Sequence, residues 1–80
     1  METKDVVVNG KQIKLKEISY LDFLKLIKLK DSPEEYAIKL FEFSTVSKEI
    51  YENFSVNEGN QLVDEINKFN GFTNFQQNSK

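Results

Sequence analysis

The stretch VVVNGKQIKL, which runs from Val6 to Leu15, decides the fold of this chain. Asn9 and Gly10 form the pair preferred in a two-residue type I′ turn, because both central positions of that turn need a positive φ. The turn predicts a β-hairpin over residues 4–16 in which Val8 pairs with Lys11. One face of this hairpin is apolar and carries Val6, Val8, Ile13 and Leu15. A lone two-stranded hairpin is marginal in water, so this face must pack on helices.

Apolar periodicity after the hairpin predicts four helices. The first follows the cap residue Ser19 and spans residues 20–30, and the second spans 33–43. A short third helix is expected over 48–54, and a last helix runs from 56 to about 70. The expected fold class is therefore α+β, with the hairpin packed on a small bundle of about four helices.

Two segments fit the capping box, in which a cap hydroxyl and the carboxylate three residues later bond each other's backbone N–H groups. These segments are Ser32-Pro33-Glu34-Glu35 and Ser55-Val56-Asn57-Glu58, and Asn70-Gly71 fits a left-handed helix stop. We expect one domain over residues 1–80, with a helical region over 20–71 and a flexible tail over 72–80.

The first helix holds more apolar residues than one face can bury. Its expected inward stripe has helical spacing and consists of Tyr20, Phe23, Leu24 and Ile27. Leu21, Leu26 and Leu29 lie off that stripe. A helix that is apolar on several sides is either sandwiched in the core or contacts a partner. The last helix has a cleaner stripe, made by Val56, Gly59, Leu62, Val63, Ile66 and Phe69.

Composition argues against catalysis. The 80 residues include no cysteine and no histidine, so disulfides, thiolate metal sites and the commonest general base are all excluded. We therefore expect no enzymatic activity, no metal and no cofactor. A chain of this length has a thin core, and association with itself or with a partner is the remaining route to extra stability.

Charge and hydropathy argue against nucleic acid and membrane. The net charge is −2, whereas a nucleic-acid footprint needs a basic excess. Lys25, Lys28 and Lys30 could form a small basic strip, but acidic side chains dominate the third and fourth helices and would repel phosphate. The longest apolar run is Val6-Val7-Val8, and no signal-peptide region follows Met1, so we expect a cytoplasmic protein.

The Asp31-Ser32 pair suggests one alternative. Acyl carrier proteins are acidic, helical and similar in length, and they attach phosphopantetheine to a serine that follows an aspartate at a helix start. Here Pro33 replaces the usual aliphatic residue, and the carrier fold has no N-terminal hairpin. A helix cap explains the same residues, so carrier function is a minor alternative.

The segment STVSKEIYENFSVNEG, residues 44–59, resembles small phage tail assembly chaperones. In that group a short acidic helix with an apolar pair precedes a capped helix that closes on Asn-Gly, as in EINKFNGF over residues 65–72. The N-terminal strand pair leading into an apolar helix is also similar. The resemblance is loose over most of the chain and best over residues 44–72.

This resemblance implies a chaperone that binds the tape measure protein, a long apolar helical chain, and helps to recruit tail tube protein during assembly of a phage tail. Surplus apolar residues suit that role. The candidate partner-binding residues are Leu21, Leu26, Leu29, Phe43, Phe72 and Phe75. A self-associating interaction or regulatory module of a mobile element shares the same composition and stays open as an alternative.

Overall fold

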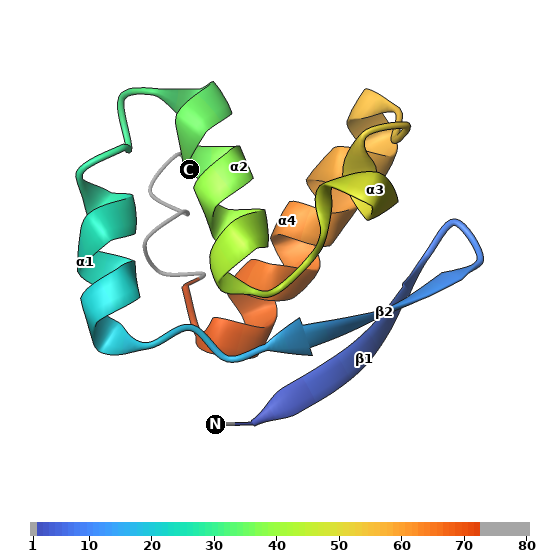
Figure 1. The fold of residues 1–80 in the computed structure, drawn as a ribbon, viewed down its shortest axis with the longest axis horizontal. Coiled ribbons are helices and arrows are strands. Elements are labelled where there is room, and N and C mark those ends of the chain that lie inside the picture. Colours follow the sequence, from blue (N-terminus) through green and yellow to red (C-terminus); the bar gives the residue numbers. More distant parts are fainter. Residues whose placement is uncertain (1, 73–80) are drawn as a thin grey trace.

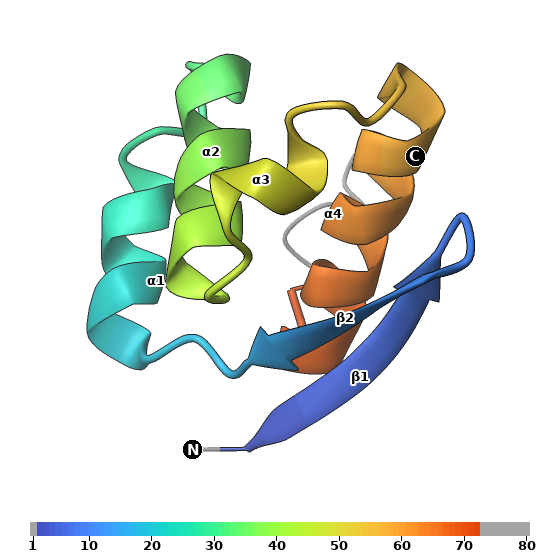
Figure 2. The same cartoon turned by 45° about the vertical axis from the view of Figure 1, so that its right-hand side comes forward.

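A computed structural model describes residues 2–72. Its elements in chain order are β1 (Thr3–Val8), β2 (Lys11–Lys16), α1 (Tyr20–Ile27), α2 (Pro33–Phe43), α3 (Lys48–Tyr51) and α4 (Val56–Asn70). The hairpin runs along one side of α4, and α1 and α2 lie side by side away from the hairpin tip (Figures 1 and 2). The short α3 bridges the gap between α2 and α4. The expected α+β fold is confirmed.

The hairpin has the predicted turn and register. Asn9 and Gly10 have φ values of 52° and 81°, as a type I′ turn requires. Val8 pairs with Lys11 and Val6 with Ile13 in an antiparallel ladder. Side chains alternate across a strand, so this register places all the predicted apolar positions on the face that packs against α4.

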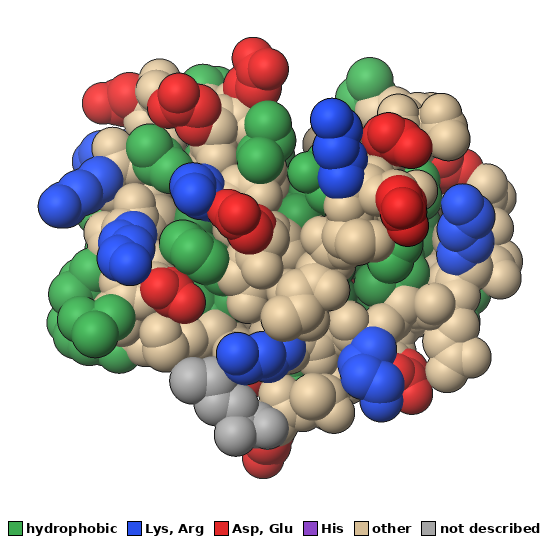
Figure 3. All heavy atoms as spheres, in the orientation of Figure 1, with side chains coloured by type: hydrophobic (Ala, Val, Ile, Leu, Met, Phe, Trp, Pro, Cys, Tyr) green, Lys and Arg blue, Asp and Glu red, His purple; other side chains and the backbone are tan. Residues whose placement is uncertain are grey.

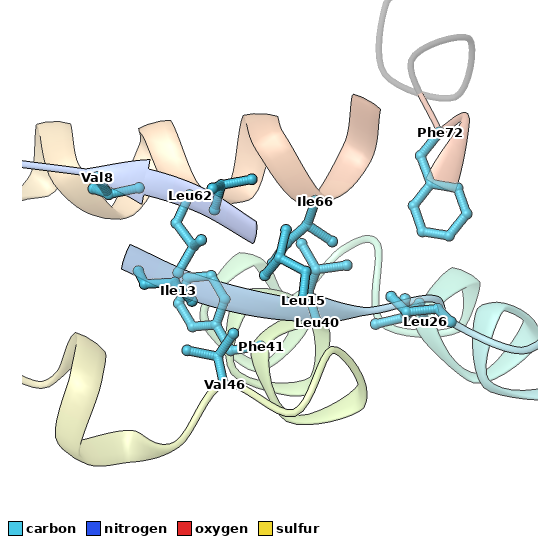
Figure 4. Packing of buried hydrophobic residues seen from close by; sticks show 12 residues of the cluster. Val8, Ile13, Leu15, Leu26, Leu40, Phe41, Val46, Leu62, Ile66 and Phe72 are labelled. Carbon is cyan, nitrogen blue, oxygen red and sulfur yellow. The ribbon is translucent and has the colours of Figure 1, made fainter. Parts of the chain in front are cut away.

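The core joins the inner face of the hairpin to α2 and α4. Leu15, Leu40 and Ile66 come from three different elements, are fully buried, and meet near its centre (Figure 4). Phe72 and Leu26 extend the cluster at the end nearest α1. The ring of Phe72 lies 4.8 Å from the ring of Phe23, measured between centroids. A single apolar cluster therefore holds the strands and the three longer helices together.

Hydrogen bonds fix the chain as it leaves the hairpin. The N–H of Lys16 donates to the carbonyl of Ser44 at 3.1 Å, which ties β2 to the end of α2. The N–H of Ile18 donates to Oδ1 of Asn70 at 2.8 Å, and Nδ2 of Asn70 donates to the carbonyl of Ile66 at 2.9 Å. The start of α1 is consequently set by the ends of α2 and α4.

Helix termini agree with the sequence at some positions and differ at others. The Ser55–Glu58 capping box is present, and Gly71 ends α4 with a φ of 75°. The box expected at Ser32 is wrong, because Ser32 has a ψ of 79° and its hydroxyl makes no capping bond, whereas the other serine caps are extended. Helices α1 and α3 end earlier than expected, at Ile27 and Tyr51. Both are followed by turns, at residues 28–31 and 52–53.

None of the helices formed by residues 2–72 has the length and apolar character needed to cross a bilayer.

Candidate protein-binding surface

Three apolar side chains of α1 face solvent, and we call them the α1 surface. They are Tyr20, Leu21 and Leu24, which are 72%, 70% and 38% exposed. Apolar side chains gather over the part of the molecule where α1 begins (Figure 3, lower left). A single exposed leucine is ordinary in a small protein, but three large apolar side chains within five residues form a patch.

The α1 surface is exposed because α1 uses its other side for the core. Leu26 is 1% exposed, and Phe23 packs on the core from the same helix. The hydroxyl of Ser19 accepts a hydrogen bond from the N–H of Asp22 at 3.2 Å and fixes the first turn. Leu26 and Phe23 determine which side of α1 faces the core. Leu21 and Leu24 lie three residues apart, so they share one side of the helix, and this side is opposite to the core.

A groove follows the exposed face of α2, and we call it the α2 groove. It consists of two neighbouring hollows that share Ile38, a side chain 44% exposed. One hollow of about 250 Å³ is also lined by Leu29 and Lys39. The other, of about 360 Å³, extends to Tyr51 and opens as a notch between α2 and α3 (Figure 3). Each hollow has room for a large apolar side chain of a partner.

The turn that forms one wall of the larger hollow is conformationally unusual. Thr45 has a φ of 64°, a left-handed conformation that β-branched residues rarely adopt. Its hydroxyl donates to the carbonyl of Ser44, and the hydroxyl of Ser44 is itself fully buried without a hydrogen-bond partner among the described residues. Backbone strain of this kind concentrates at functional sites, and Thr45 lines the larger hollow, so this end of the groove is a candidate site.

The structure separates the six residues expected to bind a partner. Leu21 lies on the α1 surface, Leu29 is half-buried at the α2 groove, and Phe43 is half-buried against the core. The expected exposure of Leu26 and Phe72 is wrong, because both belong to the core and Phe72 stacks on Phe23. Phe72 is thus part of the folded domain rather than of a tail. Phe75 lies outside the described residues.

Three surface residues were missed by sequence reasoning. Tyr20 and Leu24 were expected to face the core, and Ile38 was not singled out. The prediction was wrong because apolar residues lie on several sides of this helix, so the sequence pattern does not identify the side that packs against the core. One available signal was the spacing of Leu21, Leu24, Lys25 and Lys28, which places two leucines and two lysines on one helical face. Val56, expected to lie on an inward stripe, is also exposed.

Metal binding and modification of Ser32 are the other kinds of site to consider in residues 2–72. No group of three or more acidic side chains there could hold a metal ion. The exposed Ser32 makes only backbone hydrogen bonds, to Leu29 and from Tyr36. Among the described residues, the α1 surface and the α2 groove are the features that we consider as candidate binding sites.

Comparison of the chain with protein-family models, with curated proteins and with solved structures finds no match. The function of the chain is therefore inferred from the geometry of these two features and from the resemblance of residues 44–72.

Proposed function

We propose that this chain is a tail assembly chaperone of a long-tailed phage or prophage, which binds the tape measure protein and helps to recruit tail tube protein. The observation that carries the proposal is the exposure of Tyr20, Leu21 and Leu24 on one short helix. A protein of this length has a small apolar core, so three large apolar side chains left in solvent call for a function. The resemblance of residues 44–72 to that family supplies the identity of the client.

The proposed mechanism is temporary shielding. An apolar helical client exposes a stripe of large side chains, and burying apolar area is worth about 25 cal/mol per Å². The α1 surface offers side chains of matching chemistry on a rigid helix whose far side is anchored by Leu26 and Phe23. The α1 surface contributes only three side chains to this contact. An interface this small binds weakly, so the client can be released when tube subunits polymerise around it.

Co-expression with the tape measure protein encoded just downstream tests the proposal. The test variant carries Leu21→Gln and Leu24→Gln, which keep good helix formers in α1 while removing the apolar surface. The matched control is Val7→Thr, which changes another exposed apolar residue on the outer face of the hairpin. We expect the wild type and the control to raise the soluble fraction of the client several-fold, and the double variant to lose most of that effect.

Two results would reject the proposal. The first is a client that is equally insoluble with and without this chain. The second is a double variant that solubilises the client as well as the wild type does. Gene order is an independent check, because a chaperone gene of this class is expected between the genes for the major tail protein and the tape measure protein.

A further inference from the structure

Helix α1 presents an exposed face that is both apolar and basic. Leu21, Leu24 and Lys25 occupy positions i, i+3 and i+4 of α1, so their side chains lie on one side of the helix. Lys28, at i+7, is the C-cap residue directly after α1, and its helical φ of −66° and ψ of −19° continue that face. All four residues are exposed. The Nζ atom of Lys25 lies 3.8 Å from Oδ1 of Asp22, an exposed ion pair that contributes little and leaves the lysine available. We call these four residues the basic face.

Helix α2 presents an exposed face of the same spacing and the opposite charge. Glu35, Ile38, Lys39 and Glu42 also occupy positions i, i+3, i+4 and i+7, and all four are exposed. The two glutamates lie on either side of Ile38, and each lines one of the two hollows of the α2 groove. Nζ of Lys39 is 3.0 Å from Oε1 of Glu42, an exposed ion pair like that of Lys25, so the two carboxylates and one lysine leave this face with a net charge of −1. We call these four residues the acidic face.

The same division of charge extends over the surrounding chain. Residues 20–30, which hold α1 and most of the turn after it, contain three lysines and one carboxylate, a side-chain charge of +2. Residues 31–43, which hold α2 and the residues directly before it, contain one lysine and four carboxylates, a side-chain charge of −3. The basic face thus lies in a positive segment and the acidic face in a negative one, which favours attraction between different copies of the chain.

We infer that two copies of this chain associate by packing the basic face of α1 against the acidic face of α2 of a second copy. In this arrangement Leu21 and Leu24 enter the hollows beside Ile38, and the lysines of one copy face Glu35 and Glu42 of the other. The second copy is the occupant favoured by the structure, because this chain itself carries a helix whose spacing, apolar side chains and charge complement the groove.

This inference goes beyond the proposed function and does not depend on it. It does have a consequence for that function, because Leu21 and Leu24 are also the proposed client site. Self-association and client binding would then exclude each other, and the unoccupied chaperone would shield its own apolar surface from aggregation. The contact forms a closed dimer if it is two-fold symmetric and a longer assembly if it is not.

A charge exchange tests the inference by sedimentation velocity over a range of protein concentrations. One variant carries Lys25→Glu and Lys28→Glu, and the other carries Glu35→Lys and Glu42→Lys. We expect the wild type to show an average mass that rises with concentration. Each variant alone places like charges in contact, and we expect its association to be weaker by about tenfold or more.

Restoring the complementarity should restore association. In an equimolar mixture of the two variants, every contact between unlike chains again joins opposite charges. A chain with all four substitutions also regains opposite charges, at the contact between two of its own copies. We expect both to associate about as strongly as the wild type. Raising the ionic strength from about 0.05 M to about 0.5 M should weaken each of these assemblies through screening.

A matched control separates the local contact from net charge. Lys4→Glu with Lys11→Glu changes the net charge by the same amount as the α1 variant, but at exposed positions on the hairpin. We expect this control to associate like the wild type. Circular dichroism of every variant establishes that helix content is kept before the masses are compared.

Three results would overturn the inference. The first is a wild type that stays monomeric up to about millimolar concentration. The second is a charge-reversed variant that associates as strongly as the wild type. The third is a chain with all four substitutions that does not recover association. Because these readouts contain no client, their failure leaves the solubility test of the proposed function unaffected, and failure of that solubility test would leave the self-association result standing.

Discussion

Leu21 and Leu26 are the same residue type on the same helix, and the structure gives them opposite roles. Leu26 is 1% exposed within the core, whereas Leu21 is 70% exposed on the α1 surface. We therefore expect alanine substitution to have very different effects on folding stability at these two sites. The comparison is well matched, because both changes remove the same atoms from α1 and introduce the same helix former.

The magnitudes follow from burial. Leu26→Ala removes a fully buried side chain and leaves a cavity, which should lower the free energy of unfolding by about 2–5 kcal/mol. Leu21→Ala removes a side chain that keeps most of its exposure, and alanine has a slightly better helix propensity, so the change should lie within about 0.5 kcal/mol. A domain of this size has a total stability of about 4–12 kcal/mol, so the larger loss is a substantial part of it.

Urea unfolding followed by circular dichroism at 222 nm measures both values. The midpoint should fall clearly for Leu26→Ala and stay nearly unchanged for Leu21→Ala, with similar slopes because the area exposed on unfolding is similar. Equal losses at the two positions would contradict the roles assigned to these leucines, since the α1 surface would then be part of the core. A nearly neutral Leu26→Ala would contradict them in the same way.

Three further predictions concern stability. Thr45→Gly should raise the free energy of unfolding by about 0.5–1 kcal/mol in urea melts, because glycine relieves the left-handed φ of 64°; a destabilised variant would contradict this. Asn67→Leu should raise it by about 1 kcal/mol or more in the same assay, because the buried amide has no hydrogen-bond partner among the described residues and leucine removes that desolvated group; a loss would show that the amide is satisfied. Burial raises the pKa of Tyr36 above its usual value of 10.0, so its contribution to stability is fully present below pH 10.0 and is lost as the pH rises through the folded-state pKa. Alkaline unfolding should therefore show a smaller pH dependence in Tyr36→Phe, and identical profiles for the variant and the wild type would argue against the burial.

The fold could be predicted from the sequence wherever neighbouring residues determine a single local conformation. The Asn9-Gly10 turn fixes the register of the hairpin, and strict alternation then fixes which strand residues are buried. The Ser55 capping box and Gly71 likewise set the bounds of α4 through their own backbone bonds and conformation. These features depend on residues within a few positions of each other, so tertiary packing had little to alter.

The binding surface was less readable, because it depends on which side of α1 the core selects. Leu21, Leu24 and Leu26 have the same chemistry, and the docking of α1 against α2 and Phe72 decides that Leu26 is buried and the other two are exposed. Phe72 follows the last helix and is far from α1 in the sequence. Its place in the core could not be inferred from local spacing, and the candidate site was therefore only partly predicted.

The proposed function requires the α1 surface to bind an apolar helical segment of the client. A titration of ¹⁵N-labelled protein with a soluble peptide from the tape measure protein, followed by NMR, tests it most directly. We expect the largest chemical-shift changes at Tyr20, Leu21 and Leu24, and we expect these changes to be lost in the Leu21→Gln, Leu24→Gln variant. Changes confined to the outer face of the hairpin, around Val7 and Gln12, or no change at saturating peptide, would contradict the proposed function.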